Sequence, residues 1–419
     1  MPNLTDIFYF EKNNWVRTIF WNSLYVAFLL LPLGINLPTP FFVAAIILGV
    51  VNIFQSKTDF VADNKALLLL PLYFLLIAIS LFYTRDLSSG FDLLIRSLSL
   101  LFFPIIFLFV KEDASSVKKL FDFLLVGLVI SFFVNIGIAL QGSLEDLDKV
   151  NYNSVYGFID SIVKGLDNFI GAQFSSLVNP SYLSLYILLV LGYYLKNKIE
   201  SGLRLTVLII LFLYLFLLAS KTAYLMLTIM SVLFIIKIED KNQKYMATVI
   251  LILGLVVFLS NPRIFDFYQR IKEYDQTEMY QEVASEKARI QSWDASIRLI
   301  KEQPLFGYGL GDANTMLIKK YRELGYQRNE MEKYNAHNQF LQTMLQTGIL
   351  GAGVLIAIFF LLGRRLRRSK NEFAVFLILF TSLFFESMLV RFNGIVFLSI
   401  IIPLLLKKRS ILSSRIIRN

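Results

Sequence analysis

The stretch from Arg289 to Gly353 reads RIQSWDASIRLIKEQPLFGYGLGDANTMLIKKYRELGYQRNEMEKYNAHNQFLQTMLQTGILGAG. It closes the longest polar interval of a chain that is otherwise mostly apolar, and it holds the single histidine of the sequence, His337. From Phe340 onward it becomes a long apolar run of the kind that spans a membrane. The stretch therefore joins a polar segment to a predicted membrane helix.

Composition places the whole chain in the membrane class. Of its 419 residues, 56% are hydrophobic and 17% are charged, whereas soluble domains carry roughly 25% charged residues. The net charge is +10, but the basic residues cluster in short connections between apolar runs, which favours a membrane-orientation signal over nucleic-acid binding. The absence of cysteine excludes disulfides, thiolate metal sites and a cysteine nucleophile.

Apolar runs predict about 12 membrane-spanning helices and therefore an all-α, polytopic membrane fold. We expect residues 1–419 to form a single membrane-embedded domain. The expected spans are 18–33, 41–54, 66–82, 97–110, 120–140, 182–195, 203–218, 222–236, 245–259, 340–362, 373–390 and 392–406.

The charges in the connections predict the orientation. Basic clusters at 111–119, 196–204, 364–370 and 407–418 fall on one side of the membrane if the spans are counted correctly. Positively charged connections are typically cytoplasmic, so we expect both termini there. Two long loops, 141–180 and 260–339, then lie on the outer side.

The second outer loop is predicted to be helical. Ala288–Lys301 has apolar residues at helical spacing (Ile290, Trp293, Ile297 and Ile300), and Pro304 ends that helix. The glycine-punctuated turn FGYGLG follows at 306–311. Asp312 is the expected N-cap of a second helix, 313–324, and Gly325 its expected C-terminal cap.

Four positions stand out as chemically competent. His337 can transfer a proton near neutral pH, Arg289 can bind phosphate through two parallel hydrogen bonds, and Lys221 is a cation between two apolar runs. The alternatives are an interfacial histidine, a solvated helix charge and a snorkelling lysine. For Glu386 we expect an ion pair with Arg391, five residues on, or a supporting role near the site. No metal site is expected, because no second histidine or cysteine exists.

In the order of its motifs, the chain resembles the O-antigen ligase and O-antigen polymerase superfamily of bacterial membrane glycosyltransferases. The resemblance rests on Arg289 with Trp293 four residues on, PLFGYGLG at 304–311, HNQFLQ at 337–342 and TGILGAG at 347–353. About 65 residues carry the specific match, and the many-span layout with a large outer loop extends it.

The resemblance implies a glycan donor on undecaprenyl diphosphate, a lipid A–core acceptor, membrane lipid as the setting, and the outer face of the bacterial inner membrane as the location. It implies that no nucleotide sugar, metal or other cofactor takes part, and no nucleic acid. By position, His337 would be the general base and Arg289 would hold the diphosphate. Lys221, in ASKTAY, stands where the family commonly has a second arginine. Gly309 and Asn338 are the further positions expected to contact substrate.

Three functions fit these features. The preferred one is an O-antigen ligase, the alternative is an O-antigen or exopolysaccharide polymerase with the same donor, and the third is a non-catalytic transporter of the lipid-linked glycan. A transporter would be expected to carry charged, interrupted helices near the bilayer midplane. The charges of this chain gather at the outer side instead, which favours chemistry at the membrane surface.

Overall fold

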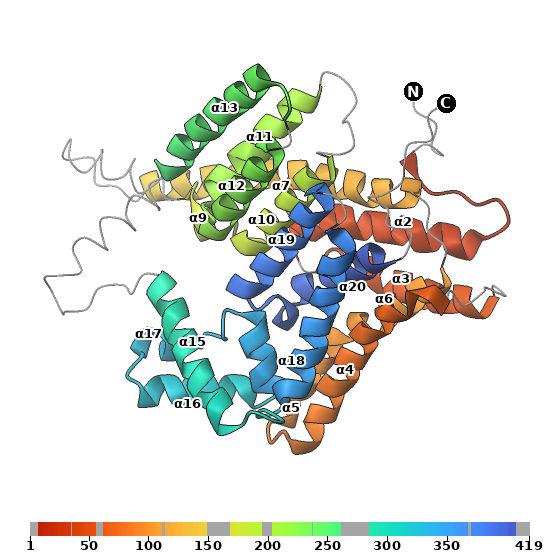
Figure 1. Cartoon of the computed structure of the whole chain (residues 1–419), viewed down its shortest axis with the longest axis vertical. Coiled ribbons are helices and arrows are strands. Elements are labelled where there is room, and N and C mark those ends of the chain that lie inside the picture. Colours follow the sequence, from red (N-terminus) through yellow and green to blue (C-terminus); the bar gives the residue numbers. More distant parts are fainter. Residues whose placement is uncertain are drawn as a thin grey trace, which may run out of the picture. The chain divides into compact units, whose positions relative to one another are not determined.

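The computed structural model describes residues 7–34, 36–55, 62–110, 114–148, 168–194, 203–236, 238–260, 285–367 and 370–407. Every regular element within these ranges is a helix, which confirms the predicted all-α class (Figure 1). Residues 149–167 of the first outer loop and 261–284 of the second lie outside the described residues. The chain divides into two compact units, each built from separate segments of sequence.

Six helical stretches are long and apolar enough to cross a membrane: Trp15–Leu33, Asn64–Tyr83, Leu87–Phe109, Ser115–Glu145, Lys241–Leu259 and Gln339–Leu366. Six shorter apolar helices accompany them: Thr39–Gln55, Pro180–Tyr194, Thr206–Leu218, Lys221–Leu233, Phe373–Phe385 and Phe392–Leu406. Each expected span overlaps one of these helices. The chain is therefore a membrane protein, and that all of them cross the bilayer stays a prediction.

Two expected boundaries are wrong. The span expected at 97–110 coincides with α6 (Ser99–Phe109), but the apolar stretch begins earlier, at Leu87, with α5 (Leu87–Ser97). Asp86 caps the start of α5 by accepting a hydrogen bond from Ser89 N. The span expected at 373–390 ends early. Helix α19 (Lys370–Phe385) stops before Glu386, and a short 3₁₀ turn, η4 (Met388–Val390), leads into α20 (Phe392–Leu406).

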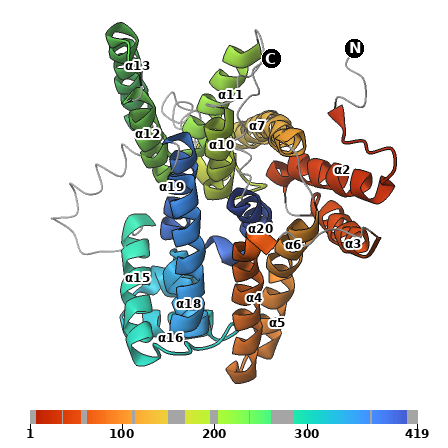
Figure 2. The same ribbon diagram turned by 45° about the vertical axis from the view of Figure 1, so that its right-hand side comes forward.

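The first unit comprises 1–22, 43–117 and 278–419, and it contains Arg289, His337 and Glu386. Its central helix, α18 (Gln339–Leu366), packs against α4 (Leu69–Ile79), α15 (Ser285–Glu302), α19 and α20. Helices α15, α16 (Ala313–Glu323) and α18 lie side by side (Figures 1 and 2). The polar helices of the second loop thus rest on a membrane helix of the same unit.

Helix α18 is broken at Gly348, which has a left-handed backbone with φ 62°. Ile349 N donates to Pro304 O at 3.0 Å instead of to the preceding turn, and Leu345 O accepts from Tyr308 N at 2.7 Å. The break leaves Ile349 N and Leu345 O without partners in the helix, and backbone groups of the PLFGY turn (304–308) bond to both. This exchange matters in an apolar setting, where an unsatisfied backbone group is costly.

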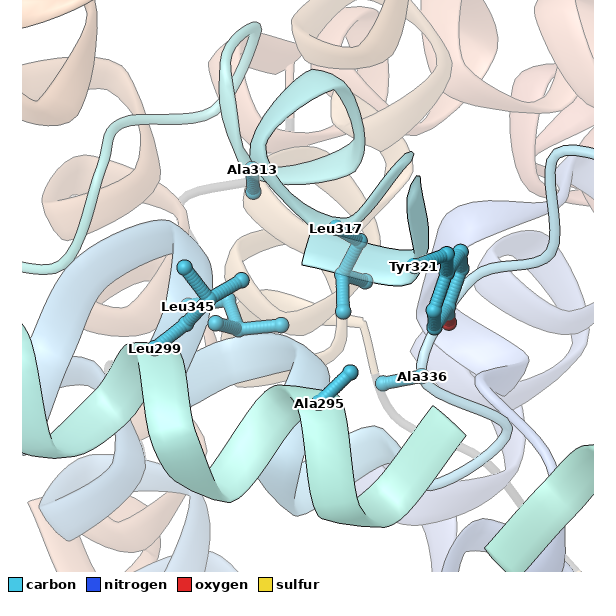
Figure 3. Packing of buried hydrophobic residues seen from close by; sticks show 7 residues of the cluster. All are labelled: Ala295, Leu299, Ala313, Leu317, Tyr321, Ala336 and Leu345. Carbon is cyan, nitrogen blue, oxygen red and sulfur yellow. The ribbon is translucent and has the colours of Figure 1, made fainter. Parts of the chain in front are cut away.

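Helix α15 packs against α16 through a cluster that combines small and large apolar side chains. Ala295 and Leu299 of α15 meet Leu317 and Tyr321 of α16 in a buried apolar cluster (Figure 3). Half of the predicted apolar stripe of α15 faces away from the protein, since Ile290 and Ile297 are 64% and 44% exposed, whereas Trp293 and Ile300 pack against it. The spacing indicated an apolar face, but most of the buried residues of α15 are small ones outside that pattern: Ala288, Ser292, Ala295 and Ser296.

The two expected caps of α16 behave differently. Gly325 adopts a left-handed φ of 71°, and Tyr326 N donates to Tyr321 O at 2.9 Å, so the glycine ends the helix as predicted. Asp312 occupies the N-cap position of α16, as predicted, but its side chain makes no capping hydrogen bond to that helix. Its carboxylate accepts instead from the backbone N–H groups of Arg85 and Asp86, at 2.7 and 3.0 Å, and so fastens the start of α5.

The second unit comprises 23–42 and 118–277. It includes most of α7 (Ala114–Asp148), together with α10 (Pro180–Tyr194), α11 (Leu203–Leu218), α12 (Lys221–Ile235) and α13 (Lys241–Leu259). Tyr214 of α11 is buried, and its hydroxyl is bonded to Ser131 and Asn135 of α7 at 2.9 and 2.7 Å. This polar cluster ties α7 to α11 inside an otherwise apolar unit.

Candidate functional site

One buried carboxylate, that of Glu386, lies between the two residues predicted to do the chemistry. Its Oε1 is 3.4 Å from Nδ1 of His337, and its Oε2 is 3.9 Å from Nη2 of Arg289. Glu386 is only 7% exposed. The structure therefore brings Arg289 and His337, predicted separately from the sequence, to the two sides of one side chain.

Arg289 reaches this position from the first half of α15. Four residues on, Trp293 lies on the same face of the helix, as the spacing requires. The Trp293 ring packs on the rings of Phe384 and Phe385 at the end of α19, with centroids 5.5 and 6.0 Å away. Its Nε1 donates to His337 O at 3.4 Å. Trp293 thus joins α15 both to the segment of Glu386 and to the segment of His337.

His337 occupies an uncommon backbone conformation, with φ 47°. Residues other than glycine rarely adopt this region, and histidine is among those enriched there. Asn335 Oδ1 accepts from His337 N at 2.9 Å, and the ring of Tyr334 meets the imidazole edge-on at a centroid distance of 5.1 Å. These contacts offset the backbone strain and fix the orientation of the imidazole side chain.

The next residues anchor the histidine to α18. Asn338 Oδ1 caps the helix by accepting from Phe340 N and Leu341 N. Gln339 is buried, and its Oε1 accepts from Leu389 N of η4 at 2.7 Å. The turn that holds Glu386 is therefore bonded to the first turn of α18, close in sequence to His337.

The Glu386 carboxyl is ionised in this setting. Burial raises its pKa, but contact with His337 and the positive charges of Arg289 and Arg391 outweigh burial, so the pKa lies below its usual value. A carboxylate facing Nδ1 favours a proton on that nitrogen and leaves Nε2 to act as an acceptor. Both contacts are longer than a close hydrogen bond, so the three groups have room to approach each other.

The predicted pairing of Glu386 with Arg391 is wrong in its main form. Within the part of the chain that the structure describes, the ion pairs of Glu386 are with Arg289 and His337. The physical reason is the end of α19, which turns the carboxylate toward α15 and α18. The supporting role near the site was the other alternative. The signal available in the sequence was a carboxylate at the end of an apolar run, which usually has a partner.

The remaining predicted site residues lie as follows. Lys221 begins α12 in the second unit, two residues after Ala219, whose φ is 47°. Asn338 uses its side-chain oxygen to cap α18. Gly309 is buried, and a Cβ at this position would lie 2.1 Å from Thr84 Oγ1, so packing against the protein already explains the glycine. The substrate-binding roles of all three stay predictions.

Chemically, the arrangement combines a guanidinium for an anion, an imidazole for proton transfer and a carboxylate that contacts both. No curated protein matches this chain. The family model described as O-antigen ligase matches residues 206–356, a segment that contains Lys221, Arg289 and His337 and ends before Glu386. This match confirms the predicted resemblance to the O-antigen ligase family over that segment of the chain.

Proposed function

We propose that this protein transfers a glycan from undecaprenyl diphosphate to a sugar hydroxyl of lipid A–core at the periplasmic face of the bacterial inner membrane. The family match supports a ligase-type glycosyltransferase. The observation that carries the proposal furthest is that Arg289 and His337 both lie within 4 Å of the Glu386 carboxylate, one at each of its oxygens. A cation for a leaving group and a base for an acceptor are thereby positioned together.

The reaction that these residues fit is a single displacement. The acceptor hydroxyl gives its proton to Nε2 of His337 while its oxygen forms a bond to the anomeric carbon of the donor. The bond from that carbon to the diphosphate oxygen breaks, and undecaprenyl diphosphate leaves with the electron pair. A positioned base of this kind contributes roughly 10²–10⁴-fold in rate.

Stabilisation of the diphosphate is assigned to two cations. Arg289 makes bidentate contacts with phosphate oxygens, which suits a guanidinium. Lys221 is proposed as the second cation, as a point charge without the planar fork of an arginine. Because diphosphate is already a good leaving group, positioning and charge stabilisation are sufficient, and the proposed mechanism uses no metal and no nucleotide.

The proposal is tested by deleting the gene and analysing both lipopolysaccharide and undecaprenyl-linked glycan. A ligase predicts long polymer retained on undecaprenyl together with bare lipid A–core. Single repeats on the core would instead indicate the polymerase alternative. Lipid-linked repeats retained on the cytoplasmic side would indicate the transporter and overturn the enzymatic proposal.

A further inference from the structure

The carboxylate of Glu386 contacts Arg289 and His337 without a close bond to either. Its oxygens are separate, with Oε2 facing the guanidinium at 3.9 Å and Oε1 facing the imidazole at 3.4 Å. Both distances allow approach by several tenths of an ångström before a close charge-assisted hydrogen bond is reached. One negative charge is therefore divided between two cationic or potentially cationic partners.

We propose that Glu386 is a positioning residue whose carboxylate competes with the donor diphosphate for Arg289. When the donor binds, Arg289 moves to the diphosphate and Glu386 keeps only its contact with His337. The inference rests on the proposed function for the identity of the anion. The groups that face the imidazole and carboxylate are Arg289 from α15, Tyr334 from the preceding segment and Arg391 at the start of α20. Arg289 is the one among them at ion-pair distance from Glu386.

The consequence follows from charge. A diphosphate carries more negative charge than one carboxylate, so it draws the guanidinium toward itself. Glu386 then keeps His337 as its ion-pair partner, closes on Nδ1, and fixes the proton there. Nε2 becomes the acceptor for the hydroxyl proton at the time when the donor is in place. Base orientation is thereby linked to occupancy of the donor site.

The surroundings favour a movement of Arg289 rather than of Glu386. Glu386 follows the end of α19 and precedes η4, whose Leu389 N is bonded to the buried Gln339. The Arg289 side chain is 24% exposed, whereas that of Glu386 is 10% exposed. A long side chain at the rim can change partner at lower cost than a buried carboxylate in a bonded turn.

The single histidine of the chain makes this coupling measurable. Full-length protein in lipid nanodiscs, labelled with ¹⁵N-histidine, gives ring signals from His337 alone among histidines of the native sequence. Farnesyl diphosphate serves as the probe and farnesyl monophosphate as the comparison. We expect the diphosphate to shift the ring signals toward the Nδ1-protonated form in the wild type. We expect R289Q to abolish that shift.

The E386Q variant separates this role from a structural one. It should bind farnesyl diphosphate at least about threefold more tightly, because the carboxylate no longer competes for Arg289. Its kcat should fall about 10- to 100-fold, because the imidazole is no longer oriented. A loss of structure would weaken binding and turnover together. E386D, which keeps the charge, should recover part of the lost turnover.

Glu302 provides a matched control. It is a carboxylate at the end of α15, paired with Lys320 at 2.9 Å, and it lies about 20 Å along the helix from Arg289. E302Q should leave the histidine signals, the probe affinity and kcat at wild-type values. Equal or weaker probe binding by E386Q would overturn the proposal, and so would a wild-type histidine signal that the diphosphate leaves unchanged.

These measurements also distinguish the coupling from the reaction. Probe binding and the histidine signals require no turnover. If the diphosphate shifts the signals but no glycan is transferred, the coupling stands and the proposed function fails. If glycan is transferred while the signals do not respond to the diphosphate, the function stands and the coupling is wrong.

Discussion

Gly348 and Leu305 approach each other so closely that no side chain fits between them. A Cβ at Gly348 would lie 2.1 Å from Leu305 O and 2.6 Å from Phe306 N. The turn is equally close to the helix at Gly307, where a Cβ would lie 2.5 Å from Leu345 O. The break in α18 and the turn of the outer loop are therefore one joint structure.

The first prediction concerns this joint. Gly348→Ala must strain a left-handed backbone and displace the 304–308 turn, so it should lower stability by about 1–3 kcal/mol and reduce activity. Gly353→Ala is the matched control in the same motif, since nothing lies within 4 Å of its Cβ position. Thermal unfolding in detergent checks both variants. Equal midpoints for the two alanine variants would contradict the close packing.

The second prediction is a pH dependence of stability. In the folded protein the pKa of the Glu386 carboxyl lies below its usual value of 4.5. Its ionisation therefore stabilises the fold above pH 4.5, and this contribution is lost as the pH falls through the folded-state pKa. The stability of the wild type relative to E386Q should decline as the pH is lowered from 6 toward 3, a range of about 3 units. A stability difference that is constant over this range would contradict the ionised, charge-paired state.

The third prediction concerns the cation proposed from the second unit. Lys221→Arg should keep transfer activity, because the positive charge remains and a guanidinium also binds phosphate. Lys221→Ala should lose about 10²–10³-fold in kcat, the range seen when one stabilising donor is removed from a transition state. Transfer assays on membranes with matched protein levels check this. Full activity of the alanine variant would remove Lys221 from the mechanism.

The fourth prediction is the stereochemistry of the product. A hydroxyl activated by His337 that attacks opposite the diphosphate inverts the anomeric carbon of the donor. NMR of the purified product, compared with the donor, determines the configuration. Retention would exclude a single displacement and would require a covalent glycosyl intermediate or a different route.

Hydropathy predicted the helices well because burial in a membrane demands long apolar segments, whatever the packing partners. Each expected span overlaps an apolar helix. The ends were less predictable. Glu386 interrupts the expected 373–390 span because α19 stops at Phe385 and delivers the carboxylate to α15 and α18. That contact joins segments far apart in sequence, and no local pattern encodes it.

The arrangement of the candidate site was predicted in part. Motif order singled out Arg289 and His337 as candidates, but the pattern did not show that they share a carboxylate. The apolar spacing of Ile290 and Ile297 predicted a helix correctly and could not indicate which side faces the protein. The side-chain chemistry of Asp312 suggested a helix cap, yet its carboxylate binds Arg85 N and Asp86 N. In each case the tertiary partner decided the outcome.

The central claim is that His337 is the base in glycan transfer from undecaprenyl diphosphate. The most direct measurement is transfer by purified protein in liposomes that contain undecaprenyl-diphosphate-linked glycan and lipid A–core, without nucleotide sugar. His337→Ala should insert normally and lower the rate by about 10²–10⁴-fold, the contribution of a positioned general base, while the control E302Q keeps wild-type activity. Wild-type transfer by His337→Ala would contradict the account.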